Sequence, residues 1–209
     1  MPEPTTTTYQ ALNQAYAFFN ARLFNNALPT CLITLQRKNR SNGFFCKSRF
    51  VSSTDTTTCD EIALNPSRFR ERGTKLVLST LVHEMVHLWQ HHYGRPGRRG
   101  YHNRQWADKM LALGLIPRTT DGSGGRQTGQ RMTHAIASGD AFERACDDLL
   151  RDGFELPYVE NGGEAMVPRR QAQSKARFSC VGCGQNAWAK PSSVLMCGAC
   201  EQPMSATDR

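Results

Sequence analysis

The stretch TKLVLSTLVHEMVHLWQHH, residues 74–92, decides the fold. Apolar side chains recur along it at steps of three and four residues, a spacing that is typical of an amphipathic helix. The stretch begins at Thr74, a residue type that caps helices, and the turn-forming sequence GRPG at 94–97 ends it. We therefore predict a helix over 74–92 whose apolar face packs against a core.

Residues 83–87 of this helix read His-Glu-Met-Val-His, an H-E-x-x-H motif. Residues four apart share a helix face, so the imidazoles of His83 and His87 can meet one Zn²⁺. Glu84 lies about 100° around the helix, where it can reach a water on the ion without binding the metal itself. That is the position of a general base in metal-assisted hydrolysis. The motif therefore predicts a catalytic zinc site with Glu84 as the base.

A catalytic zinc takes three protein ligands and keeps one position open. The candidates for the third ligand are His91, His92, His102 and His134. His91 lies about 12 Å from His83 along the helix axis, which is too far for one ion. His102 follows the Gly/Pro break, so its chain can fold back over the site, and we predict it as the third ligand. We expect His134 to be solvated or structural, and His91 and His92 to be polar surface residues.

Four cysteines near the C-terminus form the pattern C-x2-C-x13-C-x2-C, namely Cys180, Cys183, Cys197 and Cys200. This spacing favours a tetrahedral site in a zinc ribbon. The alternative is two disulfides in a secreted domain, which the sequence MPEPTTTTYQ disfavours because it lacks the basic and apolar regions of a secretory signal. The sequence thus predicts two zinc ions, one catalytic and one structural.

Apolar spacing elsewhere predicts helices over 9–25 and 103–113 and short strands over 31–36, 44–51 and 61–65. The strand at 61–65, EIALN, is a candidate edge for an extended substrate. A Gly/Thr/Ser-rich stretch over 119–130 and a second stretch over 160–175 read as linkers around a short acidic helix. We predict an α+β chain with a core domain at 1–118, a linker region at 119–175 and the ribbon at 176–209.

The chain carries 26 Lys and Arg against 18 Asp and Glu, a net charge of +8, which favours polyanionic partners and nucleic acid first. The ribbon is either a DNA or RNA clamp, with basic residues beside it as phosphate contacts, or a purely structural cap. No apolar run approaches the ~18–20 residues of a membrane span, so we expect no membrane contact. We expect a cytoplasmic protein, with association to the nucleoid as an alternative, or a nuclear one if the cell has a nucleus. The expected phosphate contacts are Arg169, Arg170, Lys175 and Arg177.

The stretch LVHEMVHLWQHHYGRPGRRGYHNRQWADKMLALGLIP, residues 81–117, resembles the SprT-like zinc metalloproteases, which include the Spartan proteases. LFNNALPTCLITL at 23–35 and DEIALNPSRF at 60–69 are similar to strand segments of that family. The resemblance covers residues 9–118, and a ribbon often follows in the family. Gln105 stands where family members often have an acidic residue, and 119–175 matches no family element.

The resemblance implies a compact zincin-like core with a small sheet against the metal helix. It implies His83, His87 and His102 as zinc ligands, Glu84 as the catalytic base, and cleavage of proteins bound or crosslinked to DNA. We therefore expect a protein substrate and DNA, single-stranded or crosslinked, as partners.

Two other functions remain open at this point. One is a nucleic-acid-binding adaptor with the ribbon as reader and a vestigial protease core, which the complete H-E-x-x-H motif disfavours because nothing structural requires Glu84. The other is an interaction scaffold that docks through the acidic run at 140–164.

Overall fold

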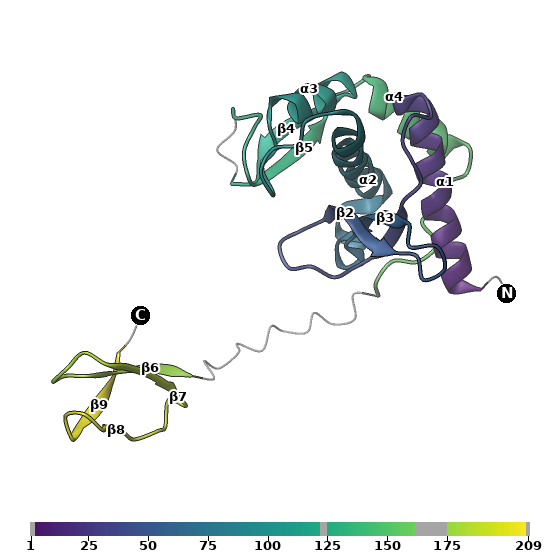
Figure 1. Ribbon diagram of the computed structural model, residues 1–209. Helices are drawn as coiled ribbons and strands as arrows, with labels where there is room; N and C mark the ends of the chain where they lie inside the picture. Colours follow the sequence, from purple (N-terminus) through teal and green to yellow (C-terminus); the bar gives the residue numbers. More distant parts are fainter. Residues whose placement is uncertain (1–2, 122–124, 162–174, 208–209) are drawn as a thin grey trace. The chain divides into compact units, whose positions relative to one another are not determined.

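The computed structural model describes residues 3–121, 125–161 and 175–207 (Figure 1). These residues form four α-helices, a short 3-10 helix and nine strands in three sheets, so the predicted α+β class is confirmed. The chain divides into two compact units, 1–161 and 162–209. Within the described ranges, no helix combines the length and the apolar character needed to cross a membrane.

The core of the first unit is built around two helices, α1 (Pro4–Phe24) and α2 (Phe69–Tyr93). The apolar stripe predicted for the second of these is buried, with Leu81, Val82 and Met85 fully so. The helix begins five residues earlier than Thr74 because it continues across a kink at Gly73, whose φ of 71° interrupts the regular backbone. Such a positive φ is readily available only to glycine.

The sheet beside α2 contains β1 (Leu32–Leu35), β2 (Gly43–Val51) and β3 (Thr58–Leu64) in the order β1-β3-β2. β3 pairs in parallel with β1 and antiparallel with β2. The expectation that residues 61–65 present a free edge is therefore wrong, because β3 is hydrogen-bonded on both sides. The strand with a free edge near α2 is β2.

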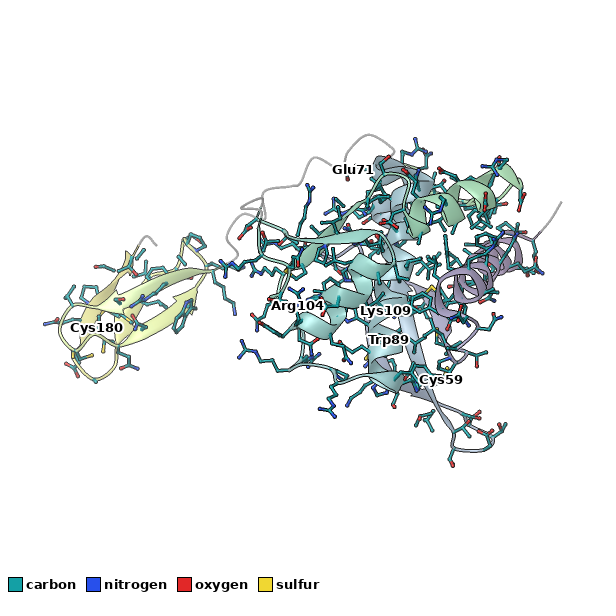
Figure 2. All side chains as sticks on the ribbon, turned by 90° about the horizontal axis from the view of Figure 1, so that it is seen from above. Cys59, Glu71, Trp89, Arg104, Lys109 and Cys180 are labelled. Carbon is teal, nitrogen blue, oxygen red and sulfur yellow. The ribbon has the colours of Figure 1, made fainter. Side chains whose placement is uncertain are left out.

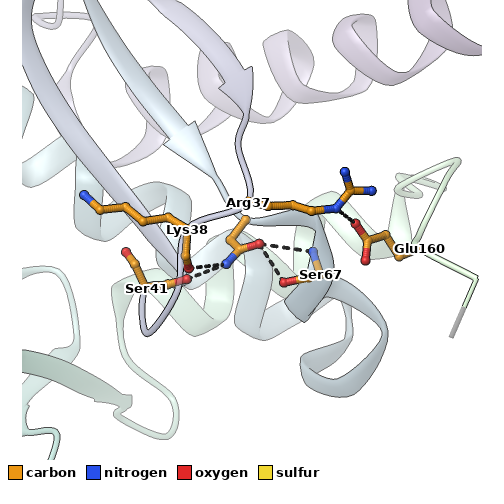
Figure 3. Close-up of polar contacts among 6 residues, drawn as sticks. Arg37, Lys38, Ser41, Ser67 and Glu160 are labelled. Carbon is orange, nitrogen blue, oxygen red and sulfur yellow. Dashed lines mark hydrogen bonds and ion pairs between the residues drawn. The ribbon is translucent and has the colours of Figure 1, made fainter. Parts of the chain in front are cut away.

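The loop between β1 and β2 is fastened to the end of β3 by Asn65. Its amide donates to the carbonyls of Lys38 and Ser41, at 2.9 and 2.7 Å, and its Oδ1 accepts from the backbone N–H and the hydroxyl of Ser67 (Figure 3). Ser67 lies in the short 3-10 helix η1 (Pro66–Arg68) that leads into α2. Asn65 thereby fixes the start of β2 with respect to α2.

The last parts of the first unit are α3 (Arg104–Ala112), β4 (Leu115–Thr119), β5 (Met132–Ile136) and α4 (Ala141–Arg151). α3 is held on α2 partly by the Lys109 ammonium, which lies 5.0 Å from the centre of the Trp89 ring (Figure 2). β4 and β5 pair antiparallel, and α4 packs on α1, where Phe142 stacks on Phe19 with ring centroids 5.6 Å apart. The short acidic helix predicted within 119–175 is confirmed as α4, whereas the strand β5 in the same region was not predicted. The domain boundaries themselves stay a prediction.

The second unit is a four-stranded antiparallel sheet of β6 (Ala176–Cys180), β7 (Asn186–Ala189), β8 (Leu195–Cys197) and β9 (Gln202–Thr207). Its strand order is β7-β6-β9-β8. Among its described residues, the buried apolar side chains are Phe178, Cys180 and Cys197. A sheet with so small a core typically needs a metal ion or disulfides for its stability.

Candidate metal centre

Three imidazoles meet on the inner face of α2. His83 and His87 are one helical turn apart with ring centroids at 5.2 Å, and the His102 ring lies 5.5 and 4.8 Å from theirs. One nitrogen of each ring lies within 4.8 Å of the other two. The structure therefore brings together the three predicted ligands in an arrangement that one metal ion can share.

His102 is held by a backbone bridge to Gly129. Its N–H donates to the Gly129 carbonyl at 2.8 Å, and the Gly129 N–H donates to the His102 carbonyl at 3.0 Å. The ring Nδ1 lies 3.1 Å from the same Gly129 oxygen. Because a carbonyl oxygen only accepts hydrogen bonds, Nδ1 carries the proton and Nε2 keeps its lone pair for a metal. The segment that holds this ligand lies in the stretch predicted as a flexible linker.

Trp106 of α3 forms the floor of the centre. Its ring is fully buried and lies 5.0 Å from the His83 ring, 5.6 Å from His87 and 4.3 Å from His102. Asn103 caps α3, because its Oδ1 accepts a hydrogen bond from the backbone N–H of Trp106, and the same Oδ1 accepts one from Gln90 Nε2 at 2.7 Å. Trp106 lies on the helix predicted over 103–113, but no role in the metal centre was predicted for it. Its position, four residues after His102, is the signal that could have identified it.

Glu84 lies on the side of α2 that faces β2, and it is 5% exposed. Burial raises the pKa of its carboxyl to about 8, against the opposing effects of Lys38 and of a hydrogen bond from the Phe45 N–H. Burial also lowers the pKa of His87 to about 3 and that of His134 to about 4. The rings are therefore neutral at pH 7, which is the form that binds metal ions.

His134 belongs to the centre and is not a solvated residue. It lies on β5, and its Nδ1 is 3.1 Å from Nδ1 of His83. Its Nε2 is 2.9 Å from the hydroxyl of Ser79. His83 and His134 are 51 positions apart and no motif joins them, so this contact could not be predicted from the sequence.

His91 and His92 lie at the end of α2, away from the three ligands, and together with Asp60 they form another group of possible ligands. His92 Nε2 is 2.7 Å from the Asp60 carboxylate, which also accepts the Ser48 N–H at 2.6 Å. A hydrogen bond between His92 and Asp60 therefore joins the end of the helix to β3.

The four predicted cysteines gather within the second unit, with the sulfur of each within 4.8 Å of the others. The Sγ atoms of Cys183 and Cys197 are 3.6 Å apart. Backbone N–H groups of Cys183 and Gly182 lower the pKa of the Cys180 thiol, which favours the metal-binding thiolate. Four sulfur donors at this spacing form a group that fits a structural metal ion.

The predicted phosphate contacts lie in and before β6. Lys175 and Arg177 are exposed, whereas Arg169 and Arg170 lie outside the described residues. Arg177 is paired across the sheet with Trp188, whose side chain is 61% exposed. A cation and an aromatic ring are therefore neighbours on one face of the sheet.

The part of the chain that holds His83, His87 and His102 is similar to known proteins. The model of the SprT-like family matches residues 12–122, which include the H-E-x-x-H motif and His102. An uncharacterized protein in the mucB 3′ region of Salmonella typhimurium is 52% identical over 59 residues, which are 28% of this chain and 80% of that protein. No solved structure matches the chain. Because the family match spans more than half of the sequence and contains His83, His87 and His102, the chain belongs to the SprT-like family.

Proposed function

We propose that the protein is a zinc-dependent endopeptidase of the SprT-like type. The observation that carries this proposal is the meeting of three imidazoles at one point, together with the buried carboxyl of Glu84 on the helix that supplies two of them. His83, His87 and His102 would hold the ion. The donor set fits zinc, since three nitrogen ligands leave a fourth position open for a water or a carbonyl oxygen.

Glu84 is the general base in this proposal. A bound zinc ion supplies Lewis-acid polarisation of a carbonyl and lowers the pKa of a water to near 7. Glu84 accepts the proton of the attacking water and passes it to the leaving nitrogen. Its raised pKa suits a group that must both take and return a proton near neutral pH, and a nearby cation would favour its ionised form.

The edge of β2 is the proposed docking strand for the substrate. β2 is paired only with β3 in its sheet, and its Phe45 N–H reaches Glu84. An extended peptide that pairs with this edge is positioned by main-chain hydrogen bonds and needs no particular side chain. This edge takes the place of residues 61–65, which lie in the centre of the sheet.

We place the substrates among proteins bound or crosslinked to DNA. The net charge of +8 and the exposed Arg177–Trp188 pair support this, because single-stranded nucleic acid is bound by cations along its backbone and by aromatic rings against its bases. The same pair supports a second candidate, an adaptor that binds DNA without cleaving protein. A structural zinc ion at the four cysteines completes this unit in both cases.

The experiment is cleavage of a basic DNA-binding protein by the full chain loaded with zinc, with and without single-stranded DNA. The variant Glu84→Gln is compared with Glu71→Gln, a matched change on the same helix at a residue that is exposed and pairs with Arg68 (Figure 2). We expect Glu84→Gln to lose about 10²–10⁴-fold in rate and to keep its zinc, and Glu71→Gln to cleave normally. If the wild type binds DNA and cleaves nothing under any condition, the adaptor takes the place of the peptidase.

A further inference from the structure

A chain of hydrogen bonds runs from a ligand histidine to the backbone of α2. His83 Nδ1 lies 3.1 Å from His134 Nδ1, and His134 Nε2 lies 2.9 Å from Ser79 Oγ. The Ser79 hydroxyl donates to the Leu76 carbonyl at 2.9 Å. Each group in the chain contacts the next, and the last is a backbone oxygen that can only accept.

The direction of every bond follows from that last oxygen. Ser79 uses its single hydrogen on Leu76, so it must accept from His134, and His134 Nε2 therefore carries a proton. The other nitrogen of a neutral His134 is then an acceptor, and His83 Nδ1 must donate to it. A neutral His83 protonated on Nδ1 has its lone pair on Nε2, the nitrogen left free for the metal.

His134 is not itself a fourth ligand in this arrangement. Both of its nitrogens are engaged, one by His83 and one by Ser79. Its position is set by β5, where it pairs with Pro117 of β4. The ring is therefore held by a strand pairing that does not depend on the metal.

We propose that His134 is a positioning residue that fixes the tautomer and the ring orientation of His83 for metal binding. This inference rests on the proposed metal centre. It deepens that proposal by assigning the group that prepares one ligand, in the way that the Gly129 carbonyl prepares His102. Partners that fix a ligand histidine in this manner typically contribute 10–100-fold, roughly, to metal affinity.

The test uses the full chain with three single variants. His134→Phe keeps a ring at the position and removes both hydrogen bonds. His134→Gln retains an acceptor for His83 and a donor for Ser79. His91→Phe is the matched control. His91 lies on α2, the helix that carries His83, but outside the three-histidine group.

Two readouts are measured. Zinc affinity comes from competition with a chelator after the four-cysteine site is filled, and the His83 tautomer comes from long-range ¹H–¹⁵N correlation spectra of the metal-free protein. We expect His134→Phe to weaken zinc binding by about 10–100-fold and to lose the Nδ1–H tautomer of His83. We expect His134→Gln to restore both, and His91→Phe to change neither.

Unchanged zinc affinity and an unchanged tautomer in a folded His134→Phe variant would overturn the inference. If that variant does not fold, Ser79→Ala takes its place, because it removes the acceptor that sets the proton on His134, and an unaltered His83 tautomer then has the same meaning. A wild type that binds zinc with the stated tautomer and cleaves no protein contradicts the peptidase and leaves the inference standing. An active enzyme whose zinc affinity is unchanged by His134→Phe contradicts the inference and leaves the peptidase standing.

Discussion

Gly43 is the position at which the spacing between β2 and the metal helix can be tested. A Cβ atom there would lie 2.9 Å from the Ala63 carbonyl oxygen, 2.9 Å from Thr80 Cγ2 and 3.4 Å from Glu84 Cγ. Ala63 belongs to the central strand and is fixed on both sides, so in Gly43→Ala the start of β2 must move away from α2.

The expected loss of stability is modest. Overpacking of this kind costs roughly 1–3 kcal/mol, and the lower chain entropy of unfolded alanine returns about 0.4–1 kcal/mol. The net loss is therefore about 0–2.6 kcal/mol, which lowers Tm by up to about 10 °C for a unit of this size. Thermal unfolding of the zinc-loaded protein, followed by circular dichroism, measures the shift.

The second expected effect is on Glu84. A displacement of about 1 Å in an active site can reduce the rate 10²-fold, so we expect kcat to fall by at least about tenfold while zinc affinity is kept. Thr80→Ser removes Cγ2 and keeps the hydroxyl that donates to the Leu76 carbonyl, so the double variant should recover part of both losses. Gly198→Ala, which has open space around its Cβ, is the control. A Gly43→Ala variant with unchanged Tm and kcat would refute the reasoning.

Three further predictions concern other parts of the chain. Phe142→Ala removes a fully buried ring and should cost about 3–5 kcal/mol in the first unit by urea unfolding, whereas a linker residue would cost nothing. Cys200→Ser should lower the zinc content by one ion per chain and unfold the second unit, while the melting transition of the first unit stays in place; loss of both transitions contradicts two separate units. The metal-free protein should lose stability as the pH falls from 6.5 toward about 3, because the pKa values of His87 and His134 are near 3 and 4 when folded and 6.5 when unfolded, so the unfolded chain binds more protons. The raised pKa of Glu84 has the opposite effect, because the folded chain binds one extra proton there, but the two histidines bind two extra protons in the unfolded chain and outweigh it. Equal urea midpoints at pH 7 and pH 5 would contradict the prediction.

The local part of the site could be predicted from the sequence. The H-E-x-x-H motif lies within one helix, and His102 follows it across a short break, so periodicity and turn residues were sufficient to place both. The α+β class followed from the same local patterns. These features depend on residues that are near one another along the chain.

The missed features depend on pairing between distant segments. β5 is only five residues long, and its sequence MTHAI has no clear alternation, so it became visible only through its pairing with β4. The central position of β3 was obscured by Glu61, a fully buried carboxylate that accepts from Thr34 and Gln36. The five consecutive buried residues at the end of that strand are typical of a central strand.

Two of the ligand orientations end on main-chain oxygens, at Leu76 and at Gly129. Every amino acid carries such an oxygen, so a substitution at position 76 that preserves the backbone leaves that anchor intact. The side chain at position 76 is therefore free to change while the His83 ring stays aimed at the same point, as long as Ser79 and His134 are kept. Position 129 is more restricted, because its φ of 154° favours glycine.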